Sequence, residues 1–102
     1  MGKTRIIARR TLKDFWERSG YEDAEGPLKA WFKKTKGSHW KNSADIKAEY
    51  GSASILKSGR VVFNICGNKY RLVVKIIYEA RLVYIRFIGT HKEYDGIDAE
   101  TV

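Results

Sequence analysis

The alternation of apolar and polar positions is strongest in the second half of the chain, where it predicts three consecutive strands. Two runs rich in β-branched and aromatic residues, Arg60–Cys66 and Lys69–Ile77, are separated by Gly67-Asn68, which supplies the positive φ of a two-residue hairpin turn. A second tight connection at Glu79-Ala80 joins the second run to a third, Arg81–Gly89. The pattern therefore predicts an antiparallel meander.

Because side chains alternate across a strand, the second run separates into an apolar face and a mixed face. The apolar face contains Tyr70, Leu72, Val74 and Ile76, and the mixed face contains Lys69, Arg71, Val73, Lys75 and Ile77. On the third run, Val83, Ile85 and Phe87 are expected to continue the apolar face.

The second turn predicts which polar residues share the mixed face. A two-residue turn pairs Val73 with Arg86 and Lys75 with Tyr84. Arg71 and Arg86 then become diagonal neighbours, roughly 7–8 Å apart at the backbone. Like charges in this arrangement are unfavourable unless an anion lies between them, which favours an anion-binding site. The alternative is that these charges are solvated on the wet face of an ordinary sheet.

The residues after the third strand predict a capped helical turn. Thr90 and Glu93 have capping-box spacing, so the turn should begin at His91 and place His91, Tyr94 and Asp95 on one face. An imidazole at a helix N-terminus meets the positive end of the macrodipole, which disfavours imidazolium and keeps the ring available as a base or acid. The alternative is a surface histidine, with Tyr94 as a packing anchor.

The beginning of the chain predicts one strand and one helix. Thr4–Ala8 is an apolar run between basic residues and predicts a strand at the sheet edge. Thr11 is a favourable N-cap, with Asp14 closing a capping box, for a helix over Leu12–Arg18.

Two further helices are expected before the meander. Pro27 suits the first turn of a helix that ends at Gly37, and Ser43 suits the cap of a shorter helix through Tyr50. The first of these has an apolar side formed by Leu28, Trp31, Phe32 and Thr35, and a basic side formed by Lys29, Lys33, Lys34 and Lys36. The lysines are either a solvated face or an RNA contact.

Together these elements predict a single α+β domain spanning residues 1–102. Helices gathered before a sheet with one apolar face indicate a two-layer arrangement, with the helices on the apolar face and the other face open.

Composition narrows the classes of partner. The 102 residues include 20 Lys and Arg against 12 Asp and Glu, a formal charge of +8 that indicates a polyanion such as nucleic acid. Cys66 is the one cysteine, so no disulfide framework is expected and a reducing compartment, the cytoplasm, fits best. Neither a metal-ligand spacing nor a cofactor motif is present, and Lys75 and Arg86 interrupt the apolar strands well before membrane length.

The order of the predicted elements is accompanied by four distinctive segments: RVVFNI, GNKYRLVV, VYIRFIGTHKEYD and IDAETV. In these features the chain resembles the HigB branch of the RelE-like bacterial toxins. It implies a RelE-like fold, an mRNA interferase that often acts on the translating ribosome, and a cognate antitoxin, commonly a HigA-like helix-turn-helix protein in a hetero-oligomeric complex.

RelE-like enzymes usually carry arginines on the sheet and a histidine or tyrosine near the C-terminus. The resemblance therefore implies catalytic roles for Arg71, Arg86, His91 and Tyr94. Lys69, Lys75, Tyr84 and Asp95 are expected to contact RNA. Which of His91, Tyr94 and Asp95 moves protons stays open, as does any role of His39.

The leading hypothesis is a metal-independent endoribonuclease that leaves a 2′,3′-cyclic phosphate. The competing hypothesis is a non-catalytic module whose basic face binds RNA or a protein partner, because a charged face and a histidine would serve that function too.

Overall fold

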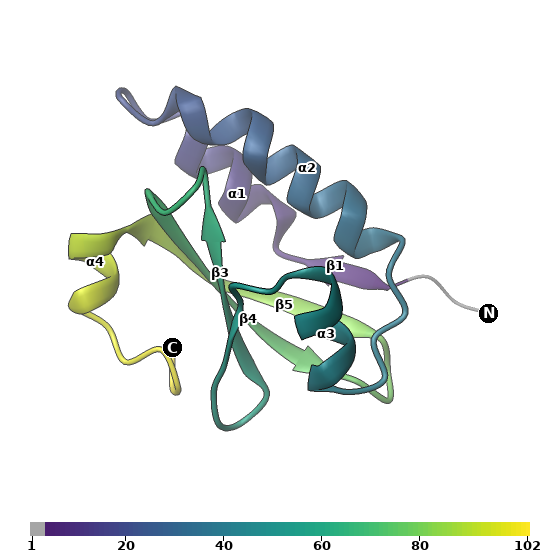
Figure 1. Ribbon diagram of the computed structural model, residues 1–102. Coiled ribbons are helices and arrows are strands. Elements are labelled where there is room, and N and C mark those ends of the chain that lie inside the picture. The colour runs from purple at the N-terminus through teal and green to yellow at the C-terminus, as the bar shows by residue number, and fades with distance from the viewer. Residues whose placement is uncertain (1–3) are drawn as a thin grey trace.

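The computed structural model describes residues 4–102, which form one five-stranded sheet with two long helices on one side of it (Figure 1). The strands are β1 (Arg5–Ile7), β2 (Ser54–Ile55), β3 (Arg60–Ile65), β4 (Tyr70–Ile77) and β5 (Leu82–Thr90), in the spatial order β1-β5-β4-β3-β2. The helices are α1 (Arg9–Trp16), α2 (Glu25–Lys36), α3 (Ser43–Glu49) and α4 (His91–Asp95), with a 3₁₀ turn η1 (Glu22–Ala24) before α2. The α+β class and the meander are confirmed.

The sheet is mixed, so the prediction of an antiparallel sheet is wrong at its first strand. β1 pairs in parallel with β5, while β2 to β5 pair in antiparallel fashion. A three-residue strand has no hairpin to fix its direction, so the local sequence does not specify it. The short edge strand β2 was not predicted.

Two helix starts differ from the predictions. α1 begins at Arg9, because Ala8 adopts a left-handed conformation (φ 74°) and turns the chain directly from β1 into the helix. Thr11 therefore lies inside α1 instead of capping it, and its amide donates to the main-chain oxygen of Ala8 at 2.9 Å. Asn42, not Ser43, caps α3 by accepting from the amide of Asp45 at 3.2 Å.

The first hairpin has the predicted register, with Asn64 opposite Arg71. The second begins as predicted, with Lys75 opposite Tyr84, but a β-bulge then shifts the pairing. Val73 consequently lies opposite Phe87, and Arg86 is the extra residue of the bulge.

The bulge changes which residues of β5 enter the core. Ile88 joins the buried cluster with an exposed fraction of 8%, and Phe87 moves to the opposite face of the sheet. Arg71 lies opposite Gly89, so the prediction that Arg71 and Arg86 are diagonal neighbours is wrong.

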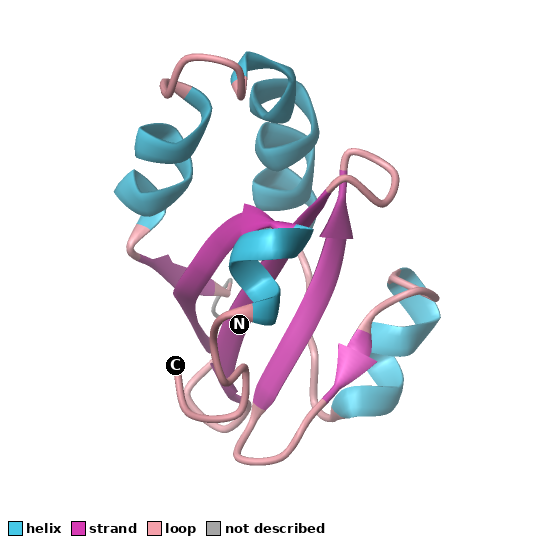
Figure 2. Ribbon diagram, turned by 90° about the vertical axis from the view of Figure 1, so that its left-hand side faces the viewer, coloured by secondary structure: helices cyan, strands magenta, loops and turns pink. Residues whose placement is uncertain are grey.

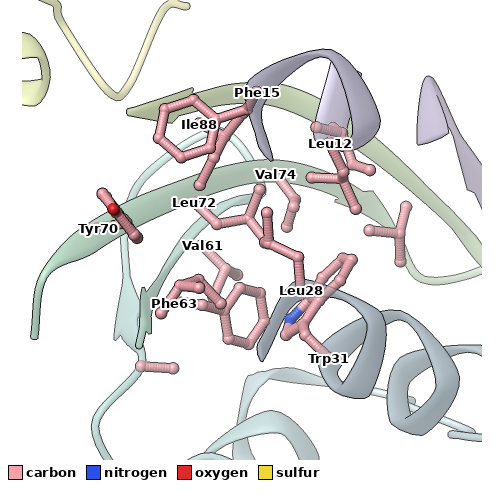
Figure 3. Packing of buried hydrophobic residues seen from close by; sticks show 14 of the residues in the cluster. Leu12, Phe15, Leu28, Trp31, Val61, Phe63, Tyr70, Leu72, Val74 and Ile88 are labelled. Carbon is pink, nitrogen blue, oxygen red and sulfur yellow. The ribbon is translucent and has the colours of Figure 1, made fainter. Parts of the chain in front are cut away.

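The core lies between the sheet and the helices, as predicted, and Ile46 of α3 belongs to it together with residues of α1 and α2. Figure 3 shows Phe15 and Leu12 of α1 and Leu28 of α2 over the apolar face of β4, where Leu72 is fully buried. Figure 2 shows α1 and α2 above the sheet, whereas α4 and the segment after it lie in front of the sheet in this view. Within residues 4–102, no helix is long and apolar enough to cross a membrane.

The sheet face away from α1 and α2 is called the outer face. Its residues form three rows across β3, β4 and β5: Arg60, Lys75 and Tyr84; Val62, Val73 and Phe87; and Asn64, Arg71 and Gly89. The prediction that this face stays open needs correction, because Val62 and Val73 are buried and the main-chain oxygen of Val102 accepts hydrogen bonds from Arg60 and Arg86.

Candidate active site

A histidine and an arginine meet at one end of the outer face, around the turn between β3 and β4. Nη1 of Arg71 donates to Oδ1 of Asn68 at 2.9 Å, and Nε2 of His91 is hydrogen-bonded to the main-chain oxygen of the same Asn68. A carbonyl oxygen can only accept, so Nε2 carries the proton and Nδ1 is left to accept one. The arrangement places a proton acceptor beside a cation, both exposed enough to meet a ligand.

The position of His91 depends on the capping of α4. Oγ1 of Thr90 accepts from the amide of Glu93 at 3.1 Å, and Oε1 of Glu93 accepts from the amide of Thr90 at 2.9 Å, which confirms the predicted capping box. The hydrogen bond from Thr90, more than the pairing with Arg18 at 3.3 Å, lowers the pKa of Glu93. Glu93 thereby joins α4 to β5 and to the end of α1.

Gly89 has no room for a side chain, because a Cβ there would lie 2.7 Å from Oε1 of Glu93 and 2.7 Å from Cζ of Phe87. We expect Gly89→Ala to push Glu93 out of the capping box and to move α4. The expected loss of stability is about 1–3 kcal/mol, as for other overpacked sites. Urea denaturation measures it, and the amide resonances of residues 90–95 report the displacement.

Gly51 provides the matched control. It is exposed, its φ is not positive, and a Cβ there would meet no atom within 4 Å. Gly51→Ala should leave stability unchanged or raise it by up to about 1 kcal/mol, because alanine loses less backbone entropy than glycine on folding. Equal stability of the two alanine variants would mean that Gly89 does not constrain α4.

Tyr94 and Asp95, the other residues of the predicted helical turn, lie at the end of α4. Tyr94 is half-buried, and its ring centroid lies 6.5 Å from that of Phe87. The bulge at Arg86 brings Phe87 to the outer face and so provides this contact. Asp95 is exposed.

Arg86 belongs to a second group on the outer face. Its Nε donates to the main-chain oxygen of Val102 at 3.2 Å, and the same oxygen accepts from Nη2 of Arg60 at 2.8 Å. Lys75 and Tyr84 lie in the same row as Arg60 and are half-buried. The structure thus brings Arg71 and His91 together and places Arg86 with Arg60.

Lys69 lies apart from both groups. The hairpin turn directs it to η1, where Nζ pairs with Oδ2 of Asp23, and the hydroxyl of Tyr70 donates to Oδ1 of Asp23 at 2.5 Å. The hydrogen bond from Lys69, followed by that from Tyr70, lowers the pKa of Asp23. Asp23 therefore joins the hairpin to the helical layer.

This pKa shift predicts an acid-sensitive contact. A carboxyl group with a lowered folded-state pKa contributes stability above its unfolded value of about 4, and the contribution is lost as the pH falls through the folded-state pKa. Asp23→Asn should therefore be less stable than wild type at pH 7, with the difference shrinking below about pH 4. Urea midpoints across this range measure it.

Asp14→Asn is the control for this titration, because Asp14 forms an exposed pair with Arg10 at 3.8 Å. Its difference from wild type should be small at every pH. A difference between Asp23→Asn and wild type that persists unchanged at pH 2 would contradict the assignment.

His39 lies far along the sheet from His91, with Tyr78 and Glu79 of the β4–β5 turn lining the same hollow. The larger hollow, of 990 Å³, lies between α1, η1 and α2 and holds none of the predicted site residues. In the part of the chain that the structure describes, no three His, Cys, Asp or Glu side chains gather as metal ligands.

Two residues beside the predicted site residues were missed by sequence reasoning. Asn68 was identified as a turn residue, but it also holds both Arg71 and His91. Arg60 was treated as the start of a strand, although the pairing rule that placed Asn64 opposite Arg71 also places Arg60 opposite Lys75. That pairing of two cations was the available signal.

Comparison with known proteins identifies the family of the chain. Residues 24–97 match the family model described as HigB_toxin, RelE-like toxic component of a toxin-antitoxin system. The chain is 33% identical over 96 residues, covering 92% of this chain and 90% of the relative, to the mRNA interferase toxin HigB of Escherichia coli (strain K12). The mRNA interferase HigB proteins of Escherichia coli O157:H7 and Shigella flexneri match to the same extent. The chain belongs to the HigB toxin family.

Proposed function

We propose that this chain is the toxin of a type II toxin-antitoxin system, an endoribonuclease that cuts messenger RNA and thereby arrests translation. We further propose that residues 1–102 act as one domain, that cleavage needs no metal ion, and that it takes place on the ribosome in the cytoplasm. The family and the names of its curated relatives support the activity.

The observation that carries the proposal is the shared contact of His91 and Arg71 with Asn68. It supports a site in which a group that can exchange a proton lies beside a fixed positive charge. General acid–base catalysis and stabilisation of a developing negative charge require this combination.

In the proposed reaction, the 2′-oxygen of a nucleotide attacks the adjacent phosphorus and its proton passes to a base. The bond from phosphorus to the 5′-oxygen breaks, and that oxygen receives a proton from an acid. The products are a 2′,3′-cyclic phosphate and a 5′-hydroxyl. His91 is the favoured base or acid and Tyr94 its partner, with Asp95 nearby in α4.

The remaining predicted residues bind and stabilise phosphate in this proposal. Arg71 supplies positive charge to the phosphorane, and such a group contributes about 10²–10³-fold in rate. Arg86, which the bulge separates from Arg71, supplies its charge to another phosphate of the same RNA. Lys75 and Tyr84 position the RNA from the outer face, and Lys69 does so from the hairpin turn once RNA competes with Asp23.

The antitoxin is proposed to be a HigA-like helix-turn-helix protein in a hetero-oligomeric complex. We place its contact on the helical side and on the sheet edge near Thr4–Ala8, where the hollow between α1 and α2 offers a surface. An acidic partner surface would associate rapidly with this +8 chain. Co-expression with the neighbouring reading frame tests this, since the correct partner relieves growth arrest and an unrelated protein does not.

Cleavage itself is tested with purified protein and messenger RNA. One reaction contains free RNA and a chelator, and a second contains translating ribosomes, with new 5′ ends mapped in both. Discrete ends that carry a 5′-hydroxyl support the enzyme, and ends confined to the second reaction support ribosome dependence. A tight, salt-sensitive complex with intact RNA in both reactions would instead support the binding module.

A further inference from the structure

Arg60 is a charged side chain that is almost fully buried, which is rare for arginine. It lies on the outer face with an exposed fraction of 9%, and its Nε is buried without a hydrogen-bond partner. Among residues 4–102, no carboxylate side chain forms an ion pair with Arg60. A buried guanidinium is costly unless an anion compensates its charge.

The surroundings of Arg60 concentrate positive charge instead of offsetting it. Lys75 lies directly opposite Arg60 across β3 and β4, and Arg86 reaches the same main-chain oxygen of Val102 that Arg60 binds. Like charges directly opposite one another destabilise a sheet. An anion between them would remove this cost.

The turn before β3 fixes the position of Arg60. Ser58 has a φ of 59° and Gly59 a φ of 73°, and the amide of Ile76 donates to the main-chain oxygen of Gly59 at 2.8 Å. Nη1 of Arg60 donates back to the main-chain oxygen of Ser58 at 3.2 Å. The guanidinium is thus held in place by its own turn, as a binding group requires.

We propose that Arg60 and Arg86, with Lys75 beside them, form a second phosphate-binding subsite for RNA, and that the main-chain oxygen of Val102 occupies it in the RNA-free chain. The subsite lies at the other end of the outer face from Arg71, since Lys75 is four positions after Arg71 in β4, about 13 Å along the strand. One RNA strand crossing the face would therefore meet the two groups through different phosphates.

The segment after α4 is suited to the role of a displaceable occupant. Its amides at Thr101 and Val102 donate to the main-chain oxygen of Asp98, at 3.1 and 2.9 Å, which closes it into a local turn. Asp98 and Glu100 are exposed acidic residues in this turn. RNA phosphates present several charged oxygens to each guanidinium, whereas Arg60 and Arg86 share one oxygen of Val102, and charge-assisted hydrogen bonds to phosphate are strong.

The first measurement is binding of a fully 2′-O-methylated RNA, which the proposed reaction cannot cleave. This proposal rests on RNA being the ligand of the outer face, but the measurement needs no catalysis. We expect Arg60→Gln to weaken binding about tenfold at low salt. The slope of log binding constant against log salt concentration should also become shallower by about 0.7, the value for one phosphate contact on a single strand.

Arg10→Gln is the matched control, because it removes the same charge from α1, where the side chain is 90% exposed. It should leave affinity within about twofold of wild type. Arg60→Lys keeps the charge and should retain more affinity than Arg60→Gln. Equal affinities of Arg60→Gln and Arg10→Gln would overturn the subsite, even if the wild-type chain cleaves messenger RNA.

The second measurement uses the wild-type chain, so it does not depend on how the variants fold. Heteronuclear NOE values of the Thr101 and Val102 amides report whether the segment is held. We expect them to fall when the methylated RNA binds, because the segment leaves Arg60 and Arg86. Unchanged values at saturating RNA would show that Val102 keeps its place and would overturn the proposed occupancy.

Failure of the proposed function has a different signature. Suppose the wild-type chain cuts no RNA in any reaction, but Arg60→Gln still binds RNA more weakly and with a smaller salt dependence. The phosphate subsite is then supported, and the proposed endoribonuclease activity is not.

Discussion

Replacing Leu72 with aspartate is expected to abolish folding. Leu72 is fully buried in the middle of β4, opposite Phe63 on β3 and Ile88 on β5. Removing a buried leucine side chain alone costs about 2–5 kcal/mol, and total stability is about 5–15 kcal/mol. Burying an unpaired carboxylate adds several kcal/mol more. Circular dichroism and urea denaturation should therefore detect no cooperative transition.

Ile55→Asp is the control for this substitution. Ile55 is 40% exposed on the edge strand β2, so the same kind of change should cost less than about 1 kcal/mol. A Leu72→Asp variant that is soluble and melts cooperatively would mean that the two faces of β4 are reversed.

The faces of β4 could be predicted from sequence because the constraint is local. The hairpin dipeptide Gly67-Asn68 fixes the register of β3 on β4, and strict alternation then assigns every residue of β4 to a face. The capping box at Thr90 is equally local, since it depends on two residues three positions apart. These features needed no knowledge of the rest of the chain.

The bulge at Arg86 could not be predicted in this way. Phe87 and Ile88 are both apolar, so the pattern of β5 does not decide which of them enters the core. The choice depends on packing against distant elements. Ile88 lies in the core with Phe15 of α1 (Figure 3), and Phe87 meets Tyr94 of α4. A one-residue shift then separates Arg71 from Arg86.

The candidate site was predictable in its residue types but not in its grouping. Arginines on the outer face and a histidine at the start of α4 followed from alternation and capping. The joint contact with Asn68 depends on side-chain reach, and the burial of Arg60 depends on the segment that ends at Val102. Neither has a local sequence signal.

His91→Ala is expected to lower the rate of RNA cleavage by about 10²–10⁴-fold, the usual contribution of a general acid or base. His91 is exposed, so the melting temperature should stay close to that of wild type. Single-turnover kinetics with one defined RNA measures the rate, and circular dichroism measures the melting temperature.

The chain supplies its own control, because it has two histidines. His39 is exposed in the loop before α3, next to the β4–β5 turn, and therefore lies at the other end of the sheet. His39→Ala removes the same ring and should leave the rate within about threefold of wild type, as expected for a surface residue away from the reacting atoms.

The comparison of the two alanine variants decides where the protons move. If both cut RNA as fast as wild type, His91 only anchors α4 to Asn68, and proton transfer belongs to another group of the outer face. Loss of activity in both would point to a general effect on the chain instead of a site. A loss confined to His91→Ala, with melting unchanged, is the result that the hydrogen bond from Nε2 to Asn68 and the free Nδ1 predict, because that tautomer leaves one ring nitrogen ready to accept the 2′ proton.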